Sequence, residues 1–511
     1  MQAMFDLTKK PFILIFLLSG LAGLLSLLPI LIGGKEGIFY SIDPESMYVG
    51  NALSYIKAHQ IDYVDHPGTP TILTLATALA PWRAYAKLII HEPFILWSLT
   101  HLDLIFGYLR LWQVMILMGA IFVFLSAIYV LTSSRLSVLG AWLAILIFSP
   151  TLWLGPSIGP ETETLLIGSF WLLILAKFLK KPRMDLMVVL GLVAGLAVAN
   201  KFTALFLIVS SVLLPLTLRR LLWYQKLANM GIVGLIAGMG FMIGTWPIKR
   251  NYNLLWKWLL KLISSTGIHG SGKKAIFDFS SYKESVLALY HQEPAIVVLI
   301  GLFLLILIYW GVVDRNKRLF LRLMLLGGVF IVGVLVFAKY PLTYYQLTNF
   351  AVLVFLITAL LNKFNKIYLV LLILILLPTF KTKVNKYLIN QSTAIAKTVT
   401  LENFVTSHPA KKATLWEWGR TEDFARLWIT SRSWHGDLFT IEREKMELAM
   451  DELDLSKLEN VFELCWDQIY IQQVSAVRFL AKYPLAQKDY KPIGDSGGMA
   501  LIESDHCLQE F

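Results

Sequence analysis

The chain has 511 residues, of which 57% are hydrophobic and only 16% are charged. Soluble domains average roughly 45–50% apolar and about 25% charged residues, so this balance excludes a soluble multidomain, disordered or fibrous protein and indicates a chain that crosses the membrane several times. The net charge of +12 then indicates cytoplasmic loops and membrane lipids, not nucleic acid, as partners.

The first predicted element is an apolar span from Pro11 to about Ile32, directly after Lys9-Lys10. A signal peptide also has a basic start, but its apolar core is only about 7–15 residues long. This stretch is longer and lacks a convincing small-x-small cleavage site. We therefore expect an uncleaved first span with its N-terminal side in the cytoplasm.

Ten further apolar segments follow, and each is a candidate to cross roughly 30 Å of hydrocarbon. The two segments at 186–199 and 202–218 are short, so their limits are the least secure. With the first span they predict a polytopic α-helical membrane protein of about eleven transmembrane helices. The ten lie at 111–132, 136–154, 164–179, 186–199, 202–218, 229–247, 295–313, 319–338, 347–362 and 367–380.

Basic residues of the short loops fall on one side of this arrangement, as at Lys180-Lys181 and Arg219-Arg220. The positive-inside rule makes that side cytoplasmic. The opposite face of the inner (plasma) membrane then receives the long loops 34–110 and 248–294, together with the tail. We expect a membrane domain over residues 1–380 and an extracytoplasmic domain over 381–511.

The tail from residue 381 is charged and mixed, and no apolar run in it has the length of a span. A small α+β domain is expected there, with strands and helices that alternate. Cys465 and Cys507 either form a disulfide outside the cytoplasm or remain two thiols. The expected strands are 413–418, 466–471 and 498–503, and the expected helices are 419–431 and 471–483.

Two acids, Asp43 and Glu45, follow the first span by a few residues. Asp43 is well placed to cap a helix over about 44–59, with Pro44 at its first position. Capping is one interpretation of Asp43, and the other is that both acids line the rim of a cavity. Asp-His-Pro-Gly at 65–68 then turns the chain back toward the bilayer.

A second acidic pair, Glu161 and Glu163, stands at the mouth of the fourth span. Carboxylates there either complement the helix dipole or face water, a cation or a partner. For Glu163 the dipole interpretation is preferred. Cations follow on the same predicted side, where they either reach lipid headgroups or bind a ligand that carries phosphate. These cations include Lys201, Arg250 and Lys339.

Three short patterns resemble those of the GT-C fold glycosyltransferases, most closely the protein mannosyltransferase and lipid A aminoarabinose transferase branch. Asp43, Glu45 and Tyr48 form Asp-x-Glu-x-x-Tyr, followed by His66-Pro67. The segment 191–202, with its Gly-x-x-x-Gly and Asn-Lys, is similar to a Gly-Leu-Ala…Thr-Lys turn of that branch. The segment 339–349 resembles its basic and aromatic entry to a late span. The likeness covers roughly residues 12–362.

The resemblance implies an inverting enzyme that moves a sugar from a polyprenyl-phosphate donor to a lipid, glycan or protein acceptor outside the membrane. Asp43 would be the general base, because that role needs an ionised acceptor beside the attacking group. Glu45 and Glu161 would orient the acceptor or hold a divalent cation, Mg²⁺ or Mn²⁺. The residues implied to stabilise the departing phosphate are Lys201, Arg250 and Lys339, and those implied to contact substrate are Tyr48, His66 and Tyr345.

The chain also departs from that branch. Gly68 stands where the branch often has a second proline, Asn200 where it has threonine, and Glu161 where an aspartate is common. The sugar and the acceptor are therefore left unassigned.

The loop 248–294 contains Trp256 and Trp258 in an amphipathic stretch that we expect at the outer membrane surface. Its glycine-rich part, 264–274, lacks the spacing of a nucleotide-binding P-loop, so that motif is rejected. A gate over a lipid-linked donor is an alternative role for this loop.

Two other functions compete with sugar transfer. A transporter or lipid flippase often carries internal repeats and broken helices, and the two halves of this chain show no repeat. An O-antigen polymerase or ligase also uses polyprenyl-linked glycans, but a large basic loop late in the chain is expected of it. Here the largest loop is the first, and it begins with acids.

Overall fold

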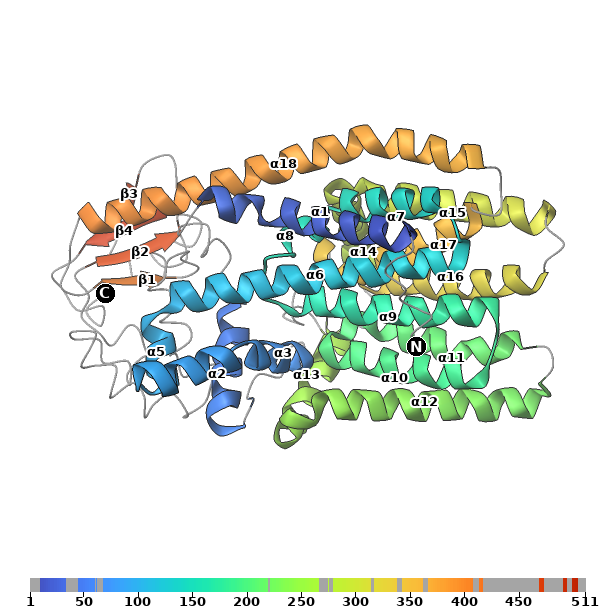
Figure 1. Ribbon diagram of the computed structural model, residues 1–511, viewed down its shortest axis with the longest axis horizontal. Coiled ribbons are helices and arrows are strands. Elements are labelled where there is room, and N and C mark those ends of the chain that lie inside the picture. The colour runs from blue at the N-terminus through green and yellow to red at the C-terminus, as the bar shows by residue number, and fades with distance from the viewer. Residues whose placement is uncertain are drawn as a thin grey trace. The chain divides into compact units, whose positions relative to one another are not determined.

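Nearly all of the residues that the structure describes are helical in a computed structural model (Figure 1). The structure describes residues 10–33, 45–59, 61, 68–218, 221–265, 274, 279–313, 317–337, 342–361, 366–407, 413–416, 468–472, 490–493 and 499–503. Each of the expected spans falls on a helix or on a run of consecutive helices. The fold class is therefore confirmed as that of a helical membrane protein.

The described elements of the first half of the chain are helices of very different lengths, of which α6 is the longest. In order they are α1 (Lys10–Gly33), α2 (Glu45–Ala58), α3 (Thr69–Ala78), α4 (Ala80–Tyr85), η3 (Ala86–Ile90), α5 (Phe94–Thr100), α6 (Leu102–Thr132), α7 (Arg135–Ile147), α8 (Ser149–Trp153), α9 (Pro160–Lys180), α10 (Met184–Asn200), η4 (Phe202–Ala204), α11 (Leu205–Leu213) and η5 (Leu214–Thr217).

The second half continues with helices and ends in four strands. They are α12 (Trp223–Thr245), η6 (Trp246–Asn251), α13 (Tyr252–Ser264), α14 (Phe279–Gln292), α15 (Pro294–Val313), α16 (Lys317–Phe337), η8 (Thr343–Gln346), α17 (Leu347–Leu361), α18 (Lys366–Ser407), β1 (Ala413–Trp416), β2 (Gln468–Gln472), β3 (Tyr490–Ile493) and β4 (Met499–Glu503).

Five helices among the described residues are long and apolar enough to cross a membrane. A bent pair over 283–309 would be a sixth if it is one span, and shorter apolar helices include α7, α10 and α16. The five are Pro11–Leu28, Leu102–Thr132, Pro160–Lys180, Trp223–Ser264 and Thr343–Leu361. The expected number of eleven spans therefore stays a prediction.

Helices α6 and α18 extend well beyond the spans expected within them. The sequence predicts a span from 111, whereas α6 begins at Leu102 and includes Asp103 and Arg110 before that point. It predicts the end of the last span at 380, whereas α18 continues to Ser407 with Pro378 inside it. Hydropathy locates apolar segments, and a helix continues past them where its charged side chains find partners or water.

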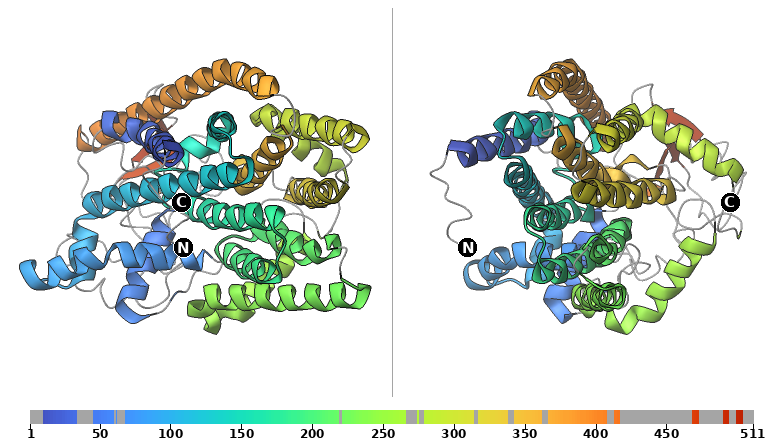
Figure 2. Two further views of the ribbon diagram at one scale, coloured as in Figure 1. Left: turned by 45° about the vertical axis from the view of Figure 1, so that its right-hand side comes forward. Right: turned by 90° about the vertical axis from the view of Figure 1, so that its right-hand side faces the viewer.

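Contacts divide the chain into two compact units. One unit comprises 1–27, 64–71 and 112–387, and the other comprises 28–63, 72–111 and 388–511. In the first unit, α9, α10, α11 and α12 run beside one another (Figure 2). Glycines make the α10–α12 contact close, since a Cβ on Gly191 would stand 2.8 Å from the carbonyl oxygen of Val233. Small residues at a helix interface let backbones approach in this way.

The described strands form one sheet in the order β1-β2-β4-β3. Strand β1 is parallel to β2, whereas β4 is antiparallel to both β2 and β3. Strands β1, β2 and β4 lie at or near the expected positions 413–418, 466–471 and 498–503, whereas β3 was not predicted from the sequence. The expected helices lie outside the described residues except for 471–472, which belong to β2. Cys465 and Cys507 also lie outside them.

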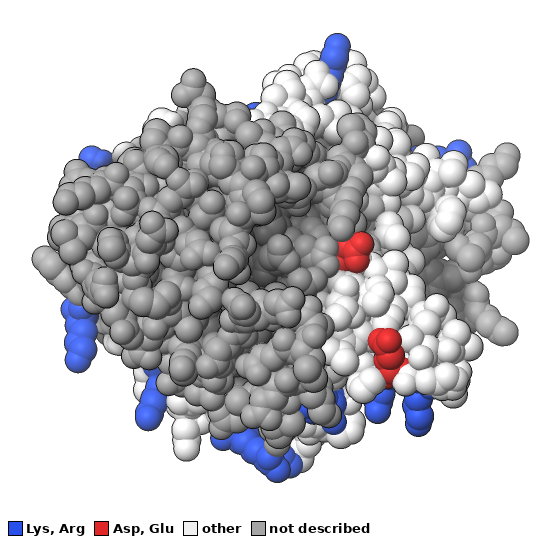
Figure 3. Space-filling view, turned by 90° about the vertical axis from the view of Figure 1, so that its left-hand side faces the viewer, with Lys and Arg blue, Asp and Glu red and all other residues white. Residues whose placement is uncertain are grey.

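Three carboxylates of the described residues are buried, namely Glu45, Glu163 and Glu293. On the face in Figure 3, basic side chains show along the rim, while acidic atoms show only in small separate patches. A buried carboxylate is costly unless it is paired or hydrogen-bonded. The partners of these acids therefore locate polar interactions in the interior of the protein.

Candidate functional site

The start of α9 carries the first half of the candidate site. Pro160 occupies the first helical turn, where its missing N–H costs nothing because that group would have no intrahelical partner. Glu161 folds back over Gly159, so that a Cβ on Gly159 would stand 2.7 Å from a Glu161 carboxylate oxygen. A larger residue at 159 would require the Glu161 carboxylate to shift.

The C-terminal end of α10 carries the second half. Lys201 leaves the helix in an extended conformation, with its N–H still donating to the carbonyl oxygen of Ala197 at 2.8 Å. Its side chain turns toward α9. The close α10–α12 contact holds α10 in place, and Lys201 directly follows that helix.

Lys201 and Glu161 form an ion pair in which both side chains are largely buried. Burial lowers the pKa of the Lys201 ammonium, while the charge and hydrogen bond of Glu161 oppose that shift. The pair brings together two residues that the sequence predicts for the site, and each charge compensates the other in a poorly solvated position.

Aromatic rings complete this cluster. The ammonium of Lys201 lies 4.5 Å from the ring centroid of Tyr345 and 5.1 Å from that of Tyr344. Trp153 contacts Tyr344 edge to face, with ring centroids 5.9 Å apart. Ring faces attract cations, so the tyrosines hold the ammonium from a second direction. We call Glu161, Lys201, Tyr344 and Tyr345 the Lys201 site.

Asn200, the residue before Lys201, holds the segments around the Lys201 site together through hydrogen bonds. Its side-chain oxygen accepts hydrogen bonds from both N–H and hydroxyl of Thr71, at 3.0 and 2.8 Å. Its amide nitrogen donates to the Pro160 carbonyl at 2.8 Å and to the Thr164 hydroxyl at 2.9 Å. A buried side-chain amide with both ends satisfied therefore joins the start of α9, the end of α10 and the first turn of α3. Sequence reasoning noted Asn200 only as a departure from threonine.

The turn at Gly68 belongs to the same set of hydrogen bonds. Gly68 has φ 54°, a left-handed conformation that glycine adopts without a Cβ penalty, and its N–H donates to the Asn200 carbonyl at 3.0 Å. Of the turn expected at 65–68, only Gly68 lies within the described residues. His66 itself lies outside the described residues.

Glu163 makes a different contact from Glu161. It is buried, and its carboxylate accepts a hydrogen bond of 2.7 Å from the side chain of Gln113 on α6. At the start of α17, the side chain of Asn349 donates to that of Gln346 at 2.6 Å. The sequence did not indicate the pair of Gln113 and Glu163, because the two residues are 50 positions apart.

In the second unit, Glu45 pairs with Arg110 of α6. Two guanidinium nitrogens donate to the two carboxylate oxygens, at 3.0 and 2.6 Å, and both side chains are buried. Tyr48, one turn along α2, is buried as well. This pairing fixes the first turn of α2, which follows Asp43 by two residues in the sequence. The predicted roles of Glu45 and Tyr48 with substrate stay predictions.

Of the three remaining predicted residues, the structure describes one. Arg250 is exposed on η6, between α12 and α13. Asp43 and Lys339 lie outside the described residues. Within the described part of the chain, no group of three or more His, Cys, Asp or Glu side chains is arranged to hold a metal ion.

The Lys201 site combines a buried cation, a carboxylate and two phenol rings in one place. Such a set can bind an anionic group through the ammonium and stack against an apolar or sugar ring. Comparisons with family models, with curated proteins and with solved structures give no match. The function is therefore argued from these residues.

Proposed function

We propose that the protein is an inverting glycosyltransferase of the GT-C type, which moves a sugar from a polyprenyl-phosphate donor to a lipid, glycan or protein acceptor. The observation that carries the proposal is the buried Lys201–Glu161 pair beside Tyr344 and Tyr345. An ionisable pair among apolar helices is costly, and in membrane proteins such groups mark functional sites.

Lys201 is assigned to the donor phosphate. An acceptor oxygen or nitrogen attacks the anomeric carbon, the bond from that carbon to the phosphate oxygen breaks, and the phosphate leaves with the electron pair. The ammonium stabilises the negative charge that grows on the leaving oxygen. Glu161 is the partner of Lys201 before the donor binds, and so keeps the ammonium oriented.

Asp43 is assigned as the general base that takes the proton of the attacking group, because this step needs an ionised carboxylate. Glu45 acts through the placement of α2, since its carboxylate is held by Arg110. Tyr48, His66, Arg250 and Lys339 remain candidates for substrate contact. The chemistry needs no metal step for atoms and charges to balance.

The proposal also includes the number of membrane spans and the side of the membrane on which each part of the chain lies. Eleven spans in the inner membrane place the N-terminal side in the cytoplasm and the Lys201 site at the outer face, where lipid-linked sugars are available. The membrane domain occupies 1–380, and residues 381–511 form an extracytoplasmic α+β domain. The basic loops of the expected cytoplasmic side support this orientation.

Deletion of the gene tests the function and identifies the substrates. We expect mass spectrometry of membrane lipids and surface glycans to show one sugar modification lost, with its polyprenyl-phosphate precursor accumulated. Expression of the wild-type chain should restore the modification. Unchanged glycans and lipid-linked sugars would contradict the proposal, and loss of a transported solute without any glycan change would favour a transporter.

A further inference from the structure

The segment Trp246–Ser264, formed by η6 and α13, combines charge and apolar surface in a way that the Lys201 site does not use. Its sequence contains four cations and no acid: Lys249, Arg250, Lys257 and Lys261. We call it the interfacial segment. It follows directly on α12, whose side chains such as Met242 and Ile243 are exposed.

One face of α13 is held by the protein. Leu255 is fully buried, and the ring of Trp258 lies 5.8 Å from that of Phe202, the residue after Lys201. The hydroxyls of Tyr252 and Thr245 are 3.0 Å apart, which joins the start of α13 to the end of α12. These contacts fix the rotation of α13 about its own axis. They therefore determine which of its other faces are exposed.

A second face is apolar and exposed. Trp256, Leu260 and Ile263 are exposed by 55%, 63% and 58%. Their spacing of four and three residues places them in one stripe along the helix. A continuous exposed apolar stripe marks a surface that is covered by a partner or by a membrane.

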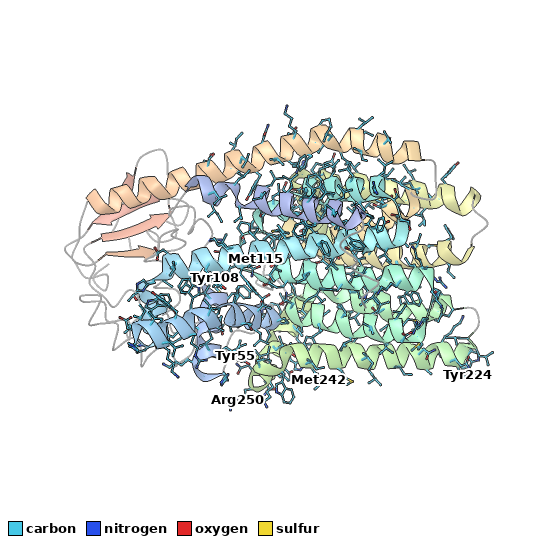
Figure 4. All side chains as sticks on the ribbon, viewed as in Figure 1. Tyr55, Tyr108, Met115, Tyr224, Met242 and Arg250 are labelled. Atoms are coloured by element: carbon cyan, nitrogen blue, oxygen red, sulfur yellow. The ribbon has the colours of Figure 1, made fainter. Side chains whose placement is uncertain are left out.

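The third face is cationic and lies next to the apolar stripe. Lys257 and Lys261 are four residues apart, so they follow each other along the helix, and both are exposed. On η6, Lys249 lies 4.4 Å from the ring centroid of Trp246, and Arg250 is exposed. Met242 and Arg250 are both labelled along the lower edge of the view in Figure 4.

We propose that the interfacial segment binds anionic phospholipid at the membrane surface. The apolar stripe enters the boundary between headgroups and acyl chains, and the adjacent cations bind headgroup phosphates. Two observations favour lipid over a protein partner. The stripe belongs to an apolar helical run, Trp223–Ser264, whose membrane-length stretch is only 22% buried. Four cations without an acid match an anionic surface.

This inference rests on membrane embedding and not on sugar transfer, so its test uses lipid binding alone. The full chain, purified in detergent, is mixed with equal amounts of phosphatidylglycerol and phosphatidylcholine, and bound lipids are counted by native mass spectrometry. We expect preferential retention of phosphatidylglycerol. The variant Lys257→Gln/Lys261→Gln should lose roughly ten-fold or more of that retention.

The matched control is Lys257→Arg/Lys261→Arg, which keeps both charges and should bind phosphatidylglycerol as the wild type does. Far-UV circular dichroism of both variants checks that they are folded. Equal retention of the two lipids by the wild type would overturn the proposal. Retention of phosphatidylglycerol by the glutamine variant within two-fold of wild type would overturn it too.

A second measurement covers the apolar stripe. Spin labels at Leu260→Cys, in the apolar stripe, and Lys261→Cys, on the cationic face, with Cys465 and Cys507 replaced by serine, report access to oxygen and to a soluble nickel complex in bilayers that contain phosphatidylglycerol. We expect the label at 260 to collide mostly with oxygen and that at 261 mostly with nickel, because the two positions lie about 100° apart around the helix. Equal access to nickel at both positions would place the stripe outside the bilayer and overturn the proposal.

Discussion

Replacing Arg110 by methionine is expected to destabilise the protein by about 3–5 kcal/mol, because it leaves the Glu45 carboxylate buried without its cation. The side chains of Arg110 and Glu45 are only 1% and 2% exposed, and two hydrogen bonds join them. The double variant Glu45→Met/Arg110→Met should recover most of the loss, since neither charge then remains buried. Titration with sodium dodecyl sulfate, followed by circular dichroism, measures the unfolding free energy.

Arg183 and Asp185 provide a matched control for this experiment. They also form two hydrogen bonds, at 3.0 and 2.7 Å, but their side chains are 58% and 56% exposed. Arg183→Met is expected to change stability by less than about 1 kcal/mol. Similar losses from Arg110→Met and Arg183→Met would show that burial does not determine the strength of the Glu45 pair.

Neutralising the Lys201 site is expected to reduce sugar transfer by roughly 100-fold or more, because the leaving phosphate loses its cation. Lys201→Met alone also leaves the largely buried Glu161 carboxylate without its cation. The decisive variant is therefore Lys201→Met/Glu161→Gln, which removes both charges together. Release of polyprenyl phosphate measures the rate, and thermal unfolding measures the fold. We expect the double variant to be stable and nearly inactive.

Tyr345→Phe is the matched control for that experiment, because it keeps the ring beside the ammonium and removes only the hydroxyl. Its transfer rate should stay within a few-fold of wild type if the ring face holds Lys201. A stable double variant that transfers sugar at the wild-type rate would remove Lys201 from the reaction.

Apolar runs in the sequence predict where the helices lie, since burial in lipid or in a helical bundle needs long stretches without charge. The spacing of Gly191 and Gly195 likewise indicates a close helix contact, and both glycines lie at the interface with α12. The ends of helices are less predictable. The apolar run that predicts the last span ends near 380, but α18 continues to Ser407 with Pro378 inside it, because the limits of an apolar run are not the limits of a helix.

The sequence also identifies Glu161, Lys201 and Tyr345, which lie together, because charged and aromatic residues beside apolar spans stand out. It does not identify Arg110 as the partner of Glu45, since the two are 65 residues apart and their pairing depends on how α2 packs. Nor does it reveal that Asn200 bonds to Thr71, 129 residues away. Such contacts depend on tertiary structure, for which residue type and local spacing carry no signal.

Turnover of lipid-linked sugar by the purified chain tests the central claim most directly. The wild-type protein and Asp43→Asn are incubated with a total extract of polyprenyl-linked sugars and membrane acceptors, and free polyprenyl phosphate is measured by mass spectrometry. We predict that the wild type releases it over time and that Asp43→Asn releases at least about 100-fold less while it still binds the donor. No release by the wild type, or equal release by the two, would contradict the account.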